Sequence, residues 1–98
     1  MDQKVYETII EACTEHNSHS KRKIDVDSGK DAKLFGADGV LDSISLVGLL
    51  ITIEQDLSAS LEKNVTLADS KAFALSENPF ETIHSLTEYT LKQLENPS

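Results

Sequence analysis

Apolar residues recur at helical intervals near both ends of the chain. Near residues 3–16, Val5, Ile9 and Ala12 follow one another at steps of four and three, which is the spacing of one face of an α-helix. Near residues 83–95, a second such face comprises Ile83, Leu86, Thr90 and Leu94, with Tyr89 beside them. No stretch shows the alternation of apolar and polar residues that is typical of a strand.

Two further helices are predicted in the middle of the chain, one near residues 43–57 and a shorter one near residues 69–75. The short helix is followed by Asn78-Pro79, and the residue before a proline disfavours helical backbone angles. The pattern therefore predicts an all-α domain over residues 1–98, a four-helix bundle with three main helices and one short helix.

A long polar stretch separates the first two helices and ends at about Asp42. It is punctuated by three glycines and several aspartates, which favour a loop. Loops of this length in compact domains are usually functional or disordered. We expect this one to be ordered, because six apolar residues can attach it to the core: Ile24, Val26, Leu34, Phe35, Val40 and Leu41.

The helix near residues 43–57 is the most apolar element. At 100° per residue, its apolar side chains cover an arc of about 220°, with Val47 expected inside the buried part and Glu54 an unexplained exception. Such a helix is expected to lie centrally, with other helices around it. The narrow stripe predicted to face solvent contains Ser45, Gly48, Thr52, Gln55 and Asp56.

Composition excludes several classes of protein. The 17 acidic and 9 basic residues give a net charge of −8, whereas a nucleic-acid-binding protein needs a cationic surface. The longest uncharged run, residues 43–53, is too short to span a bilayer, so no membrane insertion is expected. Cys13 is the only cysteine and the first residues do not resemble a signal peptide, so we expect a cytoplasmic monomer.

Ser43 is the main candidate for chemistry. It lies where the second helix is predicted to begin, and the unpaired backbone N–H groups at a helix N-terminus favour a phosphate. A phosphodiester linked to this serine could be held there without a dedicated basic residue. The alternative is that Asp42 or Ser43 only caps the helix.

The stretch Leu34-Phe35-Gly36-Ala37-Asp38-Gly39-Val40-Leu41-Asp42-Ser43-Ile44-Ser45-Leu46-Val47 resembles the attachment region of acyl and peptidyl carrier proteins. Members of that family have an Asp-Ser pair and an aliphatic residue at the start of an amphipathic helix, after a long loop. Residues 54–57 and 79–83 also resemble the family's pattern, so the likeness covers nearly the whole chain.

The resemblance implies a carrier without catalytic residues. Ser43 would accept a 4′-phosphopantetheine arm, and Asp42 would help a phosphopantetheinyl transferase engage the loop. Leu41 and Ile44 would flank the site as apolar contacts, and further partner recognition would involve Leu46 and Gly48. The thiol of the arm would carry an acyl or aminoacyl group as a thioester, loaded by an acyl-activating, adenylating or acyltransferase enzyme in lipid or secondary metabolite biosynthesis.

Two features depart from common versions of the family. Val40 stands where many members have glycine, and Gly39 lies one place earlier. The Leu41-Asp42-Ser43 version resembles D-alanyl carriers, so a D-alanine carrier for cell-envelope modification stays an alternative. Gly48, Thr52 and Gln55 replace carboxylates typical of fatty-acid carriers, which favours a dedicated, less basic partner. An unmodified helical adaptor that binds a protein through the second helix is the alternative from another class.

Other candidate sites are weak. Cys13, His16 and His19 are metal-ligand types at close spacing, but they drift around a helix and no fourth ligand is evident, so we expect no metal site. The segment Asp25-Val26-Asp27-Ser28-Gly29 starts like a calcium loop and then departs from the pattern. A hydrolase triad of Ser43, His84 and an aspartate lacks the Gly-x-Ser-x-Gly motif.

Overall fold

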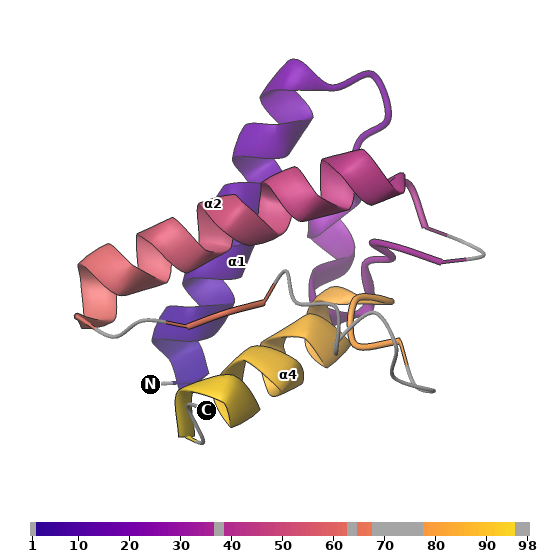
Figure 1. The fold of residues 1–98 in the computed structure, drawn as a ribbon. Coiled ribbons are helices and arrows are strands. Elements are labelled where there is room, and N and C mark those ends of the chain that lie inside the picture. Colours follow the sequence, from indigo (N-terminus) through magenta and orange to yellow (C-terminus); the bar gives the residue numbers. More distant parts are fainter. Residues whose placement is uncertain (1, 37–38, 63–64, 68–77, 96–98) are drawn as a thin grey trace.

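The computed structural model describes residues 2–36, 39–62, 65–67 and 78–95 (Figure 1). These residues form three α-helices, α1 (Asp2–His19), α2 (Ser43–Leu61) and α4 (Ile83–Glu95), and the short 3₁₀ helix η1 (Val26–Asp31). They contain no strand, and the sole β-bridge among them pairs Lys33 with Thr82. The all-α prediction is therefore confirmed for the described residues, while the helix expected near residues 69–75 lies outside them.

The boundaries of the three α-helices agree with the sequence pattern at most ends. α4 spans the predicted residues, and Thr82 caps it by accepting a hydrogen bond from the backbone N–H of Ser85 (3.1 Å). α1 and α2 extend beyond their predicted ends, to His19 and Leu61. α2 stops where Glu62 adopts a left-handed conformation (φ 56°), a common way for a helix to end.

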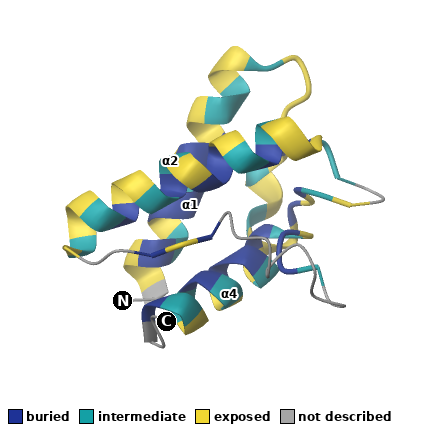
Figure 2. Cartoon of the chain, in the orientation of Figure 1, coloured by how far each residue is buried: buried dark blue, intermediate teal, exposed yellow. Residues whose placement is uncertain are grey.

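The core lies between the helices (Figure 2). Each full burial of a large aliphatic side chain contributes about 1.5–3 kcal/mol. At one edge, the ring of Phe80 packs edge-to-face on Tyr89, with ring centroids 5.9 Å apart. The fully buried side chains include Val5 and Ile9 from α1, Leu46, Leu50, Ile53 and Leu57 from α2, and Ile83 and Leu86 from α4.

The described residues of the long first loop are held by contacts with the core, as predicted. Ile24, Leu34 and Leu41 are buried, whereas the three other expected anchors are partly buried and pack against the core. Backbone hydrogen bonds also join this loop to the start of α4, including Leu34 N–H to Glu81 O (2.8 Å) and Phe35 N–H to Phe80 O (3.0 Å). The sequence analysis did not identify η1, which has no buried residue and therefore no apolar periodicity.

The expected burial of α2 is wrong at one edge of its apolar arc. Ile44 is 86% exposed and Ile51 is 43% exposed, and Val47 is only half-buried. Ser45 and Thr52, which were expected to face solvent, are half-buried beside α1. Gly48, Gln55 and Asp56 are exposed as predicted. The solvent-facing stripe of α2 is therefore shifted, and it also includes two isoleucines.

α2 is long and apolar enough to cross a membrane by length and composition. Five of its side chains, all leucine or isoleucine, are buried inside the protein. The expectation that this stretch is too short to span a bilayer is therefore wrong on length, although a core helix passes the same test and a single such helix is weak support for a membrane span.

Candidate functional site

Ser43 is the first residue of α2, and Asp42 caps this helix. Asp42 has an extended backbone, and its Oδ1 accepts a hydrogen bond from the backbone N–H of Ser45 (2.7 Å). The backbone carbonyl of Asp42 accepts the first intrahelical bond, from Leu46 N–H (2.9 Å). Asp42 thus performs the capping that the sequence left open between Asp42 and Ser43.

The hydroxyl of Ser43 is left available by this arrangement. The side chain of Ser43 is exposed and makes no hydrogen bond with the part of the chain that the structure describes. It stands at the N-terminal end of α2, where the helix dipole favours negative charge. The hydroxyl of Ser43 is therefore accessible at the start of a helix. Its modification would break no hydrogen bond among the described residues.

The loop before Ser43 is held by backbone contacts. Leu41 N–H donates to Leu34 O (2.9 Å), and Gly39 N–H donates to Gly36 O (3.0 Å). A Cβ atom on Gly39 would lie 2.6 Å from the carbonyl oxygen of Leu34 and 2.7 Å from the Cα of Phe35. This contact is closer than side chains permit, so the fold requires glycine at position 39. The close approach accounts for a glycine here rather than at Val40.

Arg22 lies near the start of the long first loop, just after α1, and its side chain reaches the end of that loop beside Ser43. Its guanidinium group lies 3.4 Å from the carbonyl oxygen of Gly39. Hydrogen bonds from Ser45, with its backbone N–H foremost, lower the pKa of the Asp42 carboxyl, and the positive charge of Arg22 lowers it further. Asp42 therefore carries a negative charge beside Ser43 at neutral pH.

The other predicted recognition residues divide into two groups. Ile44 and Gly48 are exposed, and a Cβ atom on Gly48 would meet nothing within 4 Å. Leu41 and Leu46 are buried, at 6% and 0% exposure. The expectation that Leu41 and Leu46 offer surface contacts is therefore wrong. Both side chains fill the core beneath Ser43 and position it instead.

Cys13, from the weak metal candidate, lies on α1, and His84, from the weak hydrolase candidate, lies on α4. Cys13 is buried, and burial raises the pKa of its thiol to about 12, so the free thiol stays protonated at neutral pH. Within the described residues, no group of three potential ligands could hold a metal ion. His84 lies 3.8 Å from Glu88 on an exposed face of α4, and no hydrogen bond joins His84 to Ser43.

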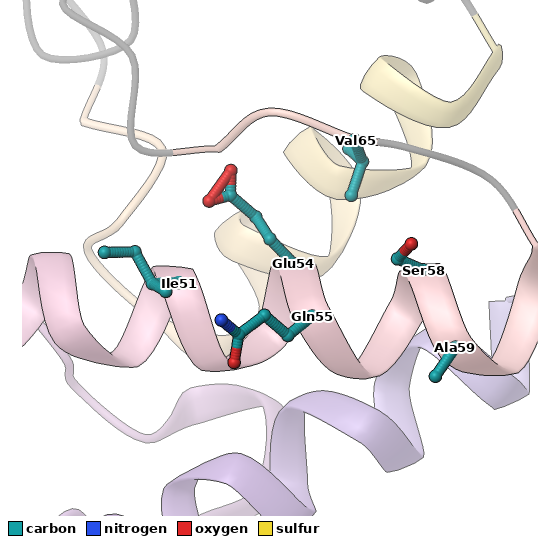
Figure 3. A pocket seen from close by; sticks show the side chains of 6 residues that line it. All are labelled: Ile51, Glu54, Gln55, Ser58, Ala59 and Val65. Carbon is teal, nitrogen blue, oxygen red and sulfur yellow. The ribbon is translucent and has the colours of Figure 1, made fainter.

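Glu54, which the sequence pattern left unexplained, holds the segment after α2. Its carboxylate accepts a hydrogen bond from the backbone N–H of Leu67 (3.0 Å). Figure 3 shows Glu54 pointing from α2 toward the segment that carries Val65, across an open pocket of about 420 Å³. The half-buried carboxylate thus has a backbone partner that compensates for its place inside the apolar arc.

The sequence analysis missed the roles of Gly39 and Arg22 beside the candidate site and of Glu54 farther along α2. The glycine was visible as a departure from the family pattern, but its close backbone approach leaves no trace in the sequence. Arg22 belongs to a short basic run that is typical of a solvated loop.

Comparison of this chain with family models, with curated proteins and with solved structures gave no match.

Proposed function

We propose that this protein is a carrier that bears a 4′-phosphopantetheine arm on Ser43 and shuttles an acyl or aminoacyl group between enzymes. The observation that carries the proposal is the exposed hydroxyl of Ser43, which has no hydrogen-bond partner among the described residues and begins a helix capped by Asp42. A covalent arm needs an accessible attachment point on a rigid element. The anionic phosphodiester is favoured by the N-terminal end of α2.

Each neighbouring residue has a role in the proposed modification. Asp42 keeps the start of α2 fixed and presents a carboxylate to the transferase, while the exposed Ile44 offers an apolar contact beside the attachment point. Leu41 and Leu46 support the site from the core. The bound arm would supply a thiol that holds the cargo as a thioester, so the protein itself needs no catalytic group.

The finer architecture belongs to the same proposal. The order of α1, a long ordered loop, α2 and α4 is compatible with a four-helix carrier bundle in which a short helix near residues 69–75 completes the domain. We place this carrier in the cytoplasm as a monomer. Its partners would be a phosphopantetheinyl transferase and an acyl-activating, adenylating or acyltransferase enzyme.

A second candidate function is favoured by the exposed face of α2. Ile44, Gly48 and Ile51 are exposed on a stretch without a charged side chain. Such a surface loses little hydration free energy when a protein covers it. An unmodified adaptor would use this stripe directly, and Ser43 would then be unimportant.

Mass spectrometry separates the two functions. The full chain is coexpressed with a broad-specificity phosphopantetheinyl transferase, and the intact mass is measured. We expect the wild type to gain one phosphopantetheinyl group and Ser43→Ala to gain none. Ser60→Ala is the matched control, because Ser60 is another exposed serine of α2 that lies away from Asp42; it should still be modified.

An unmodified wild type would count against the carrier. Loss of binding to a partner protein in Gly48→Arg, with unchanged binding in Ser43→Ala, would favour the adaptor. If the carrier is confirmed, the substrate that its adenylating enzyme activates distinguishes a D-alanine carrier from other carriers.

A further inference from the structure

A second pocket lies away from the candidate attachment site, where α1, η1 and α4 meet. Its volume is about 380 Å³, within the range of small-molecule sites. None of its residues belongs to α2 or to residues 34–42, which lead into it. Its walls include Gln3 and Tyr6 from α1, Lys30 from η1, and His84, Glu88 and Leu91 from α4.

The junction that forms this pocket is fixed by the backbone. The N–H of Ile83 donates to the carbonyl of Ala32 (3.1 Å), which joins the end of η1 to the start of α4. Within η1, Gly29 has a positive φ of 60°, and a Cβ atom there would lie 3.2 Å from the hydroxyl oxygen of Tyr6. Lys30, which follows this glycine, is therefore carried by a segment that packs against α1 and α4.

The polar groups of the pocket are unequally satisfied. The Nε2 atom of His84 lies 3.8 Å from a carboxylate oxygen of Glu88, and the two form an ion pair when the histidine is protonated. The ammonium group of Lys30 and the hydroxyl of Tyr6 make no hydrogen bond or ion pair with any residue that the structure describes. The pocket thus offers one cation and one hydroxyl donor whose hydrogen-bonding capacity is not used within the described fold.

The remaining lining is mixed, because Gln3 and Thr87 are polar whereas Tyr6 and Leu91 contribute apolar surface. The side chains of Tyr6 and Leu91 are half-buried and pack against the core, so each presents an apolar face to the pocket. A ligand that suits both parts carries an anionic group at one end and an apolar body at the other, because charge-assisted hydrogen bonds are the strongest polar contacts available here.

We propose that this pocket binds a small organic carboxylate. The carboxylate would accept hydrogen bonds from Lys30 and Tyr6, and the apolar body would lie against Tyr6 and Leu91. Glu88 fixes the orientation, because its negative charge keeps the ligand's carboxylate on the Lys30 side of the pocket. This site is separate from Ser43 and does not depend on the proposed carrier function.

The test is a titration of the full chain with hexanoate, followed by ¹H–¹⁵N NMR. We expect saturable shifts at Tyr6, Lys30 and the α4 residues near Leu91. Hexan-1-ol, which has the same apolar body without the charge, should bind more weakly. Binding should be the same in Ser43→Ala, so this test and the modification test can fail independently.

Charge variants make the assignment specific. Lys30→Gln should weaken hexanoate binding about fivefold, whereas Glu88→Gln should strengthen it by removing a like charge. Lys92→Gln is the control, because Lys92 is an exposed cation of α4 that does not line the pocket. Absence of saturable shifts, equal binding of hexan-1-ol, or an unchanged affinity in a folded Lys30→Gln variant would overturn the proposal.

Discussion

Asn17 forms two reciprocal hydrogen bonds with the backbone of Ile24. The side-chain amide of Asn17 donates to the carbonyl of Ile24 (2.7 Å), and its side-chain oxygen accepts from the N–H of Ile24 (2.7 Å). This pairing turns the chain from the end of α1 into the long loop. It also delivers the buried side chain of Ile24 to the core.

Asn17→Asp should therefore destabilise the protein although it changes only one atom of the side chain. A carboxylate cannot donate to the Ile24 carbonyl, and loss of one partner in a part-buried pair costs about 1–3 kcal/mol. Urea denaturation measures the change in the free energy of unfolding. Ser18→Ala, in which an exposed local hydrogen bond is lost, should stay within about 0.5 kcal/mol of the wild type.

Two glycine-to-alanine substitutions should change stability in opposite directions. Gly39→Ala places a methyl group against the backbone at residues 34–36 and should destabilise by about 1–3 kcal/mol. Gly48→Ala adds a methyl group in open space within α2 and should stabilise by about 0.5–1 kcal/mol. Thermal melting compares the two, and equal melting temperatures would contradict the close approach at Gly39.

Leu50 and Val47 should differ in their tolerance of truncation. Leu50 is fully buried, so Leu50→Ala should cost about 2–5 kcal/mol. Val47 is half-buried, and Val47→Ala should cost less than half as much. Even Val47→Asp should leave a folded protein, which the circular dichroism spectrum checks; an unfolded Val47→Asp chain would show that this face of α2 is more deeply covered.

Asp42 should contribute to a dependence of stability on acid pH. Its pKa is below the usual 3.8 in the folded protein, so the stabilisation is complete above the usual value and is lost as the pH falls through the lower, folded value. Asparagine caps a helix as well as aspartate does but does not titrate. Asp42→Asn should therefore lose less stability than the wild type on acidification, whereas Asp42→Ala should be less stable than the wild type at neutral pH.

Thermal midpoints measured across the acid range give this comparison. The same slope in wild type and Asp42→Asn would mean that other carboxyl groups determine the acid transition. Phosphopantetheinylation of both variants by the transferase then reports whether the carboxylate itself is needed beside Ser43.

The sequence predicted the helices well because their apolar faces are long and regular. Ile83, Leu86, Thr90 and Leu94 recur at steps of three and four, and all four are buried. The position of Ser43 at a helix start followed from a local capping pattern, which requires no tertiary information. The ordered loop could also be predicted, since its apolar residues have no other reason to interrupt a polar stretch.

The rotation of α2 could not be predicted in the same way. Its apolar arc is wider than the surface that its neighbours cover, so the sequence alone did not decide which edge stays exposed. Ile44 and Ile51 lie on the uncovered edge. The role of Glu54 was hidden for a related reason, because its partner is a backbone N–H thirteen positions away.

The backbone pairing between residues 32–35 and 80–83 has a consequence for the order of events during synthesis. The stretch that leads into Ser43 gains these hydrogen bonds only when residues 80–83 have been synthesised and have docked on it. A nascent chain that ends before residue 78 lacks these partners, and its serine would sit on an unanchored segment. An enzyme that recognised Ser43 through the shape of this segment would therefore act only after residues 80–83 have docked on it.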